Sequence, residues 1–236
     1  MASVYLVISL PIAFLVRESP TRERARKAPE VEERHFPLSE KEVIMWMSTA
    51  VIFCCICMSV PIVHLVPMLT DDNRSVEFAT SVLLVLMLAG GVGRIMGGGK
   101  LGDVIGALPT YLIMSLGQSL TVLWFPHIEA VAGLYLLAVV FGFTYSGVMS
   151  SILVCVRMMV SARVSARAMS LTSFFGWSGM GMGGFFGGLF FDINGDYDVS
   201  FAFAAFMGLV NVVILALFYI CIKAQRIARM PALGKL

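Results

Sequence analysis

Long uninterrupted runs of apolar residues, separated by short polar segments, dominate the chain. Six of these runs are long enough to cross a bilayer, whose hydrocarbon core of roughly 30 Å requires a helix of about 20 apolar residues. They occupy residues 43–67, 76–97, 108–126, 129–153, 168–191 and 199–222. The pattern therefore predicts an all-α membrane protein built on six spanning helices.

Three further segments complete the expected domain organisation. A shorter apolar run lies within residues 1–16, with no basic segment before it and no small-residue cleavage site before Arg17, so we interpret it as a partial transmembrane helix and not a signal peptide. Residues 17–42 mix both charge signs and contain three prolines, which indicates a linker. The six runs form one domain, 43–222, and residues 223–236 form a tail.

Composition changes this picture little, but it argues against a soluble domain and against nucleic-acid binding. Apolar residues make up 58% of the chain and charged residues only 14%, against about 25% charged in soluble domains. The expected partner for most of the surface is therefore the lipid bilayer. The net charge of +2 is too small to predict binding to nucleic acid.

The basic residues divide unequally between the two sides of the predicted bundle. On one side they fall in residues 17–42, 94–107, 154–167 and 223–236. On the other side the loops contain several aspartates, and Arg74 is their only basic residue. The positive-inside rule then places the linker and the C-terminus in the cytoplasm. We expect a multi-pass protein of the plasma membrane.

A glycine-rich segment follows the second run and reads Gly99-x-Leu101-x-Asp103-x-x-Gly106. It resembles the loop motif G-x-L-x-D-x-x-G of the major facilitator superfamily of transporters (MFS). Glycines let two helix ends approach closely, and an aspartate near the start of the following helix is favoured by the helix dipole. The resemblance implies that Asp103 helps to latch one cytoplasmic conformation. The alternative is a tight glycine-rich turn with a capping aspartate.

A longer resemblance points to the monocarboxylate-type members of the same superfamily. Residues 184–202, GFFGGLFFDINGDYDVSFA, are similar to the end of helix eleven and the start of helix twelve in those carriers, at Gly188, Phe191, Asp192, Gly195, Tyr197 and Phe201. Residues 64–71 resemble the exit of helix seven, and residues 10–17 the exit of helix six. The resemblance implies the C-terminal half of a twelve-helix carrier: a six-helix bundle of two inverted three-helix repeats, about 43–126 and 129–222, preceded by a partial helix.

The function that this resemblance implies is transport of a small solute, such as a monocarboxylate or other organic anion, by alternating access. Six helices alone do not easily form such a pathway, so an N-terminal transporter half or a homodimer is the expected partner. The alternative is a truncated or regulatory membrane protein without transport of its own. No nucleophile with a base, H-E-x-x-H motif or paired membrane aspartates indicate an enzyme, and no cofactor is expected.

Arg94 is the one basic residue at the inner part of an apolar run. An arginine at the bilayer centre costs roughly 3 kcal/mol or more, so such residues are usually functional. Monocarboxylate and oxalate carriers keep an arginine in helix eight that pairs with the substrate carboxylate, and the resemblance implies this role for Arg94. It lies one residue further from the loop aspartate than in those relatives, a rotation of about 100° unless a bulge absorbs it. The alternative is an arginine that snorkels to the headgroups.

Further residues bear on this candidate substrate site. Gly90 stands one turn before Arg94, where the monocarboxylate carriers have an aspartate. His64, between two prolines near the outer end of its run, suits substrate binding or proton coupling; alternatively, it is a headgroup-level histidine at a kinked helix end. Tyr145 and several serines either line a polar path or bond to neighbouring backbone. These serines are Ser146, Ser150, Ser151, Ser173 and Ser178.

Glycines and cysteines mark two further features. Small residues four apart allow close helix approach in lipid, which predicts either a packing face between moving helices or a homodimer seam. The glycines concerned are Gly179, Gly183, Gly184, Gly187 and Gly188. The cluster Cys54, Cys55 and Cys57 has thiols that suit a soft metal, but its spacing fits no zinc pattern and no histidine is near. We interpret these cysteines as small packing residues and expect no metal.

Overall fold

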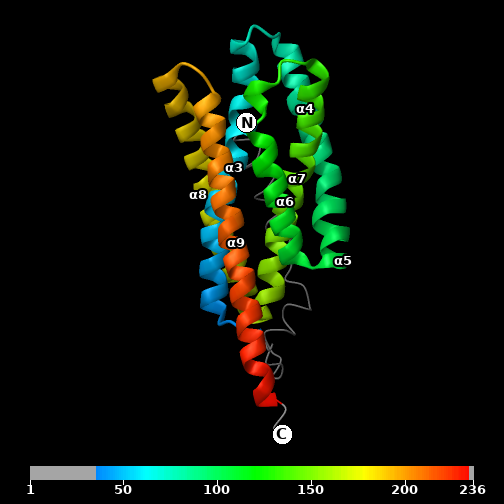
Figure 1. Ribbon diagram of the computed structural model, residues 1–236, viewed down its shortest axis with the longest axis vertical. Coiled ribbons are helices and arrows are strands. Elements are labelled where there is room, and N and C mark those ends of the chain that lie inside the picture. The colour runs from blue at the N-terminus through cyan, green and yellow to red at the C-terminus, as the bar shows by residue number, and fades with distance from the viewer. Residues whose placement is uncertain (1–35, 234–236) are drawn as a thin grey trace, which may run out of the picture. The chain divides into compact units, whose positions relative to one another are not determined.

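The computed structural model describes the backbone of residues 36–233 and the side chains of residues 36–227. The predicted partial helix 1–16 and most of the predicted linker 17–42 lie outside these residues. Every regular element in the described range is helical (Figure 1). The elements are α3 (Glu40–Asp71), α4 (Val76–Ile95), the π-helix η1 (Met96–Leu101), α5 (Gly102–Ile105), α6 (Ala107–Val122), the 3₁₀-helix η2 (Phe125–His127), α7 (Val131–Met159), α8 (Ala162–Asn194) and α9 (Asp198–Leu233).

The predicted all-α membrane bundle is confirmed, with one correction to the number of strongly apolar spans. Five described segments are long and apolar enough to cross a membrane, and α8 is not among them. The reason is compositional: α8 is 33 residues long, but its many glycines and serines lower its hydropathy. Its length and its packing along α3 keep it in the bundle as the sixth long helix.

The ends of the helices follow from local sequence. At the start of α3, the Ser39 hydroxyl accepts a hydrogen bond from the Glu42 N–H (3.3 Å), while the Glu42 carboxylate accepts from the Ser39 N–H (2.8 Å). This reciprocal capping box satisfies two donors that the first helical turn leaves free. Two helices end at a glycine with a positive φ angle: Gly106 (φ 93°) separates α5 from α6, and Gly195 (φ 77°) ends α8. Glycine adopts these positive φ angles without steric cost.

The six long helices pack as two groups of three, and each group combines helices from both predicted repeats. One group contains α3, α8 and α9, and the other contains α7, α4 and α6, as Figure 1 shows. Exchanging α3, α4 and α6 with α7, α8 and α9 converts the pair α3–α8 into α7–α4, and the pair α3–α9 into α7–α6. Each first helix thus packs on the second and third helices of the other repeat. This is the pairing expected of two related three-helix units.

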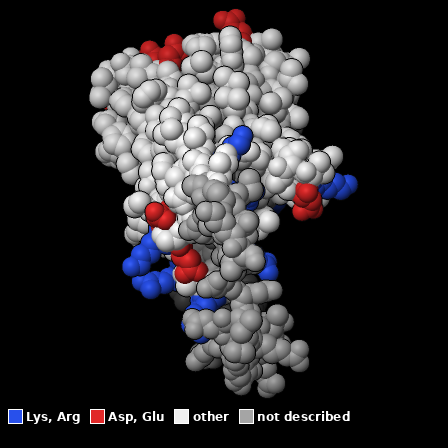
Figure 2. Space-filling model, turned by 60° about the horizontal axis from the view of Figure 1, so that its bottom comes forward, with Lys and Arg blue, Asp and Glu red and all other residues white. Residues whose placement is uncertain are grey.

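On the face that Figure 2 displays, charged side chains gather toward the two ends of the bundle, and between them lies a broad, mostly uncharged band interrupted by a basic side chain. Acidic residues alone occupy one end of this face, and basic residues, accompanied by further acidic ones, lie toward the other. At the acidic end the core is closed by η2, because the buried ring of Phe125 packs on Phe141 of α7 and Phe201 of α9, with ring centroids 5.7 and 6.0 Å away. The uncharged band matches a surface that faces lipid.

Candidate functional site

The helices α3 and α8 run parallel and in constant register along one side of the site. Partners in their interhelical hydrogen bonds differ by 120 or 121 positions in the chain throughout. Three such bonds join them: the Ser161 N–H to the Glu40 carboxylate (2.9 Å), the Ser59 hydroxyl to the Met180 carbonyl (2.6 Å) and His64 Nε2 to the Gly184 carbonyl (2.9 Å). Two parallel rods thus form one wall.

Glycines of α8 permit this close approach. A Cβ added at Gly179 would lie 2.5 Å from the Ile52 carbonyl oxygen, and one at Gly183 would lie 2.6 Å from that of Ile56. Real Cβ atoms do not approach backbone so closely, so only glycine fits while the helices stay this near. A Cβ added at Gly187 would lie 2.6 Å from the ring of His64. These three glycines therefore face α3 inside the chain and are not available as a homodimer seam.

The other two glycines of the predicted set are less constrained. A Cβ at Gly184 would lie 3.7 Å from the Ser59 hydroxyl oxygen, and one at Gly188 would lie 3.7 Å from Cε1 of His64, both ordinary contact distances. They border the seam without being required by it. The predicted stripe is thus narrower than the sequence pattern, because each of these two glycines directly follows a seam glycine and so points about 100° away from it around α8.

The opposite wall, α4 with α7, is built in the same way. A Cβ added at Gly93 would overlap the backbone of Phe143, and one added at Gly142 would overlap the backbone of Leu86. Close backbone contact is a main source of helix association in lipid, because the lipid tails are as apolar as the side chains and no hydrophobic effect drives the helices together. Both walls therefore rest on glycine contacts between a first helix of one repeat and a second helix of the other.

A cavity of about 430 Å³ lies between the two walls, lined by residues of α3, α4, α7 and α8. Most of its lining is apolar, including the ring of Trp177, which is 75% exposed. Among the described residues that line it, Arg94 alone is charged, and its side chain is exposed toward the space. Its other polar lining side chains are Cys55, Tyr145, Ser150, Thr172 and Ser173.

Arg94 and Tyr145, two of the three residues predicted from the sequence to bind substrate, thus line one cavity. The Tyr145 ring stacks on Phe141, with centroids 5.8 Å apart, and its hydroxyl lies 3.4 Å from the Met87 sulfur. A Cβ at Gly90 would lie 3.3 Å from that hydroxyl. The absence of a side chain at Gly90 therefore makes room for Tyr145.

The π-helix η1 lies between Arg94 and Asp103. A π-helical turn bonds residue i to i+5 and so accommodates one more residue than an α-helical turn, and such turns are frequent at functional sites. The extra residue of η1 is the kind of bulge that would absorb the one-residue displacement of Arg94 that the resemblance implies.

Sequence reasoning missed Thr172. Its Oγ1 is buried, with the residue 1% exposed, and it has no hydrogen-bond partner among the described residues. Threonines in helices usually bond to a carbonyl one turn back, as Thr144 does to Val140 (2.9 Å). Nothing in the sequence separates these two threonines. An unpartnered buried hydroxyl at a cavity wall is available to a ligand.

His64, the third predicted residue, lies outside this cavity and bonds α3 to α8 instead. The candidate serines do not divide cleanly between the two alternatives. Ser150 and Ser173 line the cavity, and the Ser150 hydroxyl also donates to the Arg94 carbonyl (3.4 Å). Ser151 donates to the Gly147 carbonyl (2.8 Å), and Ser178 donates to the Phe174 carbonyl (2.9 Å).

The loop motif continues the α4 rod. Gly99 and Leu101 belong to η1, Asp103 lies in α5, and Gly106 provides the sharp turn into α6. Asp103 is exposed and precedes this turn. It lies in the first turn of the short helix α5, near the start of the element that follows η1, and its role as a latch stays a prediction.

Residues of the helix eleven–twelve resemblance close the acidic end of the bundle. Tyr197 stacks on Phe191 with centroids 4.4 Å apart and contacts Phe201 edge-on at 6.4 Å. Its hydroxyl donates to the Asp71 carboxylate at 3.4 Å. Burial, followed by the nearby Asp71 charge, raises the pKa of Tyr197 above its ordinary value. Its neutral form therefore persists to higher pH and links the end of α3 to the α8–α9 turn.

The three clustered cysteines diverge to different neighbours. Cys54 accepts a hydrogen bond from Gln118 Nε2 (3.4 Å), Cys55 lines the cavity, and Cys57 lies beside Gly208. Within the described part of the chain, no three His, Cys, Asp or Glu side chains are grouped to hold a metal ion. The sulfurs serve as packing atoms on three sides of α3.

Comparison with known families identifies this architecture. The family described as Major Facilitator Superfamily matches residues 47–230. The chain therefore belongs to the Major Facilitator Superfamily, and together with its apolar helices this makes it a multi-pass membrane transporter. No curated protein matches the chain. Its monocarboxylate-type character and its place as a C-terminal half stay predictions.

Proposed function

We propose that this chain is the C-terminal half of a carrier that moves a small organic anion across the membrane by alternating access. The observation that carries the proposal is the cavity in which Arg94 is the one charged side chain among the described lining residues. A single uncompensated guanidinium in an apolar surrounding favours an anionic ligand.

The chemistry of the lining supports a carboxylate. A guanidinium presents two parallel N–H donors to a carboxylate and binds it in bidentate fashion. The Tyr145 and Thr172 hydroxyls offer further donors at the same cavity. The methionine and tryptophan side chains suit the organic part of the ligand, and about 430 Å³ lies within the usual range for small-molecule sites.

The position of the cavity supports alternating access. It lies between the first two helices of each repeat, where transporters of inverted-repeat design bind substrate near the midplane. Arg94 is exposed on this side, which is where an N-terminal half or a second copy would complete the pathway. Rocking of one half against the other would then transport the anion without covalent chemistry, with Asp103 as a conformational latch.

The distribution of basic residues supports a topology for this carrier. Linker 17–42 and the C-terminus lie in the cytoplasm in our proposal, and the aspartate-rich loops face the outside of a plasma membrane. His64 has a positioning role in this scheme, since its ring bonds α3 to α8 outside the cavity.

Transport assays in proteoliposomes test the proposal. We expect no uptake by the purified monomeric chain, and saturable uptake of a radiolabelled monocarboxylate when the chain is reconstituted with an N-terminal half encoded beside it. Arg94→Ala should abolish this uptake, whereas Arg226→Ala, at the basic end of α9, should leave it intact. Saturable uptake by the monomer, or normal uptake with both Arg94→Ala and Arg94→Lys, would contradict the proposal.

A further inference from the structure

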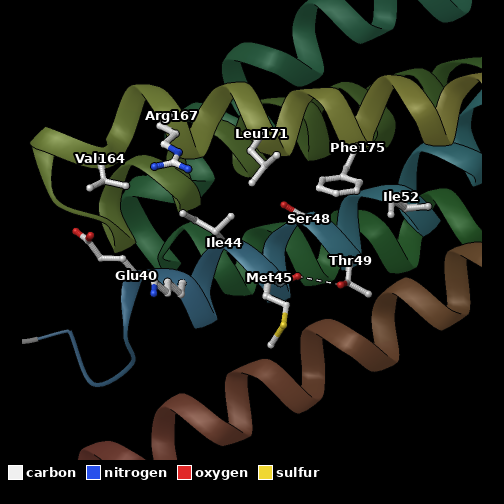
Figure 3. Close-up of a pocket in the computed structure, with 11 residues that line it drawn as sticks. Glu40, Ile44, Met45, Ser48, Thr49, Ile52, Val164, Arg167, Leu171 and Phe175 are labelled. Atoms are coloured by element: carbon white, nitrogen blue, oxygen red, sulfur yellow. Dashed lines mark hydrogen bonds between the residues drawn. The ribbon is translucent and has the colours of Figure 1, made fainter.

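A second cavity, of about 520 Å³, lies in the same α3–α8 seam near the basic end of the bundle (Figure 3). Its lining on α3 includes Ser48 and Ile52, whereas the first cavity uses Val51 and Cys55 of the same helix. Adjacent helical positions point about 100° apart. The two cavities therefore open on different sides of the seam, and this second one, the α3–α8 groove, does not belong to the Arg94 site.

The α3–α8 groove changes from charged to apolar along its length. Lys41 and Arg167 are exposed cationic side chains that line its outer part. Figure 3 shows the Arg167 guanidinium directed from α8 toward α3 beside Ile44, and Leu171 and Phe175 following it along the groove. A ligand that fills this groove therefore has an anionic head and an apolar tail.

Among the described residues that line the groove, Glu40 is the one carboxylate, and it is already engaged. Glu40 accepts a hydrogen bond from the Ser161 N–H at 2.9 Å, at the start of α8. The two cations outnumber this carboxylate, so the described lining of the groove mouth carries a net positive charge. Basic pockets between transmembrane helices near the cytoplasmic surface are typical binding sites for lipid headgroups.

Ser48 adds a second polar feature deeper in the groove. Its residue is 5% exposed, and its hydroxyl has no hydrogen-bond partner among the described residues. Figure 3 shows this hydroxyl on the α3 surface that faces Leu171 and Phe175. In the α3–α8 register, Ser48 lies slightly further from the basic end than Arg167. It therefore offers a donor slightly deeper in the bilayer than a phosphate bound at Arg167, where a glycerol ester carbonyl would lie.

The length of the groove matches one bilayer leaflet. From Lys41 to Ile52, α3 rises about 16 Å at 1.5 Å per residue, and α8 rises similarly from Val164 to Phe175. One leaflet contributes about 15 Å of hydrocarbon. A groove that begins at the charged end and extends through one leaflet suits an acyl chain whose headgroup stays at the membrane surface.

We propose that the α3–α8 groove binds an anionic glycerophospholipid from the leaflet at the basic end of the bundle. Lys41 and Arg167 bind its phosphate, Ser48 donates to an ester carbonyl, and one acyl chain packs against Ile44, Leu171 and Phe175. This site is independent of the proposed transport function, because it uses neither Arg94 nor the cavity around it.

Spin-labelled lipids in nanodiscs test this proposal on the full chain. We expect spin-labelled phosphatidylglycerol to be motionally restricted by the protein at lower concentration than spin-labelled phosphatidylcholine. A basic residue near a membrane surface contributes about 1 kcal/mol toward anionic lipid, so Lys41→Gln and Arg167→Gln should each lower the preference about five-fold. Arg167→Lys should restore most of it, and Leu171→Trp, which fills the groove, should lower binding of both lipids.

Arg226→Gln is the matched control, since Arg226 is an exposed arginine of α9 outside the groove lining. It should leave the preference unchanged. Three results would overturn the proposal: equal restriction of the two lipids, an equal loss in Arg226→Gln and Arg167→Gln, or displacement of the lipid by glycerol 3-phosphate, which would indicate a site for a soluble anion. Circular dichroism and a monodisperse elution profile establish that each variant is folded, and the Arg167→Lys rescue separates loss of charge from loss of structure.

Discussion

His64 Nε2 lies 2.9 Å from the carbonyl oxygen of Gly184, across the seam between α3 and α8. A carbonyl oxygen only accepts hydrogen bonds, so Nε2 carries the proton and donates it. The ring also occupies the space left by Gly187, where a Cβ would come within 2.6 Å of it. The histidine and the glycine together fix how closely the two parallel helices pack at this level.

Removing this imidazole should therefore loosen the seam without changing ligand charge preference. We expect His64→Ala to lower the free energy of unfolding by about 1 kcal/mol or more, since interhelical hydrogen bonds in membranes contribute about 0.6 kcal/mol on average and lost packing adds to this. Unfolding in mixed micelles measures it. His127→Ala, at an exposed histidine of η2, should have little effect, and an equal loss in both variants would contradict this role.

Two neighbouring glycines of α8 provide a sharper test of the seam. Gly183→Ala should destabilise the protein by about 1–3 kcal/mol, because the new methyl group would overlap the α3 backbone. Gly181 has nothing within 4 Å of its added Cβ. Gly181→Ala should therefore be neutral or stabilising by up to about 1 kcal/mol, as alanine is the better helix former. Equal effects of the two substitutions would show that the glycines do not set the helix spacing.

Gly90 and Gly91 form a similar pair beside the candidate site. A Cβ at Gly90 would lie 2.8 Å from the Ser146 hydroxyl and 3.2 Å from the Tyr145 ring, whereas Gly91 has open space. Gly90→Ala should displace Tyr145 and weaken binding of a monocarboxylate several-fold, and Gly91→Ala should not. Equilibrium binding to the purified chain measures both. Unchanged binding in Gly90→Ala would remove Tyr145 from the proposed site.

The π-helix predicts an unusual tolerance to deletion. Removing Gly99 should convert η1 to regular α-helix and keep Gly106 and α6 in place, because η1 contains one residue more than an α-helical turn needs. Removing Leu88 from the α-helical part of α4 should instead rotate all following residues by about 100° and disrupt packing on α7. The yield of folded, monodisperse protein compares the two. Loss of folding on removal of Gly99 would contradict this account of η1.

The sequence anticipated the helices better than their contacts. Apolar runs locate all six long helices, because a spanning segment must be long and largely apolar, although α8 is less apolar than the other five. The ends were less predictable: α9 continues as a helix to Leu233, beyond the apolar run that ends near 222. Helix formation does not stop where hydrophobicity stops, and no glycine or proline lies between residue 222 and Pro231.

The direction of each side chain explains which residues of the candidate site could be predicted from the sequence and which could not. Arg94 and Tyr145 could be singled out by their types alone, since a charge or phenol within an apolar run invites a functional interpretation. Thr172 could not, because its lack of a partner depends on which way α8 faces. His64 was assigned to the same site by its chemistry, yet its ring fills the space that Gly187 leaves in the seam between α3 and α8.

The most direct test of the central claim is equilibrium binding of a small monocarboxylate, and of its neutral amide, to the purified chain. The cavity should bind the carboxylate and reject the amide, since loss of a charged hydrogen-bonded partner costs about 1.5–3 kcal/mol, roughly ten-fold or more in affinity. Arg94→Ala should remove this discrimination, and Arg226→Ala should preserve it. Equal affinity for the carboxylate and the amide, or discrimination that survives Arg94→Ala, would contradict the account.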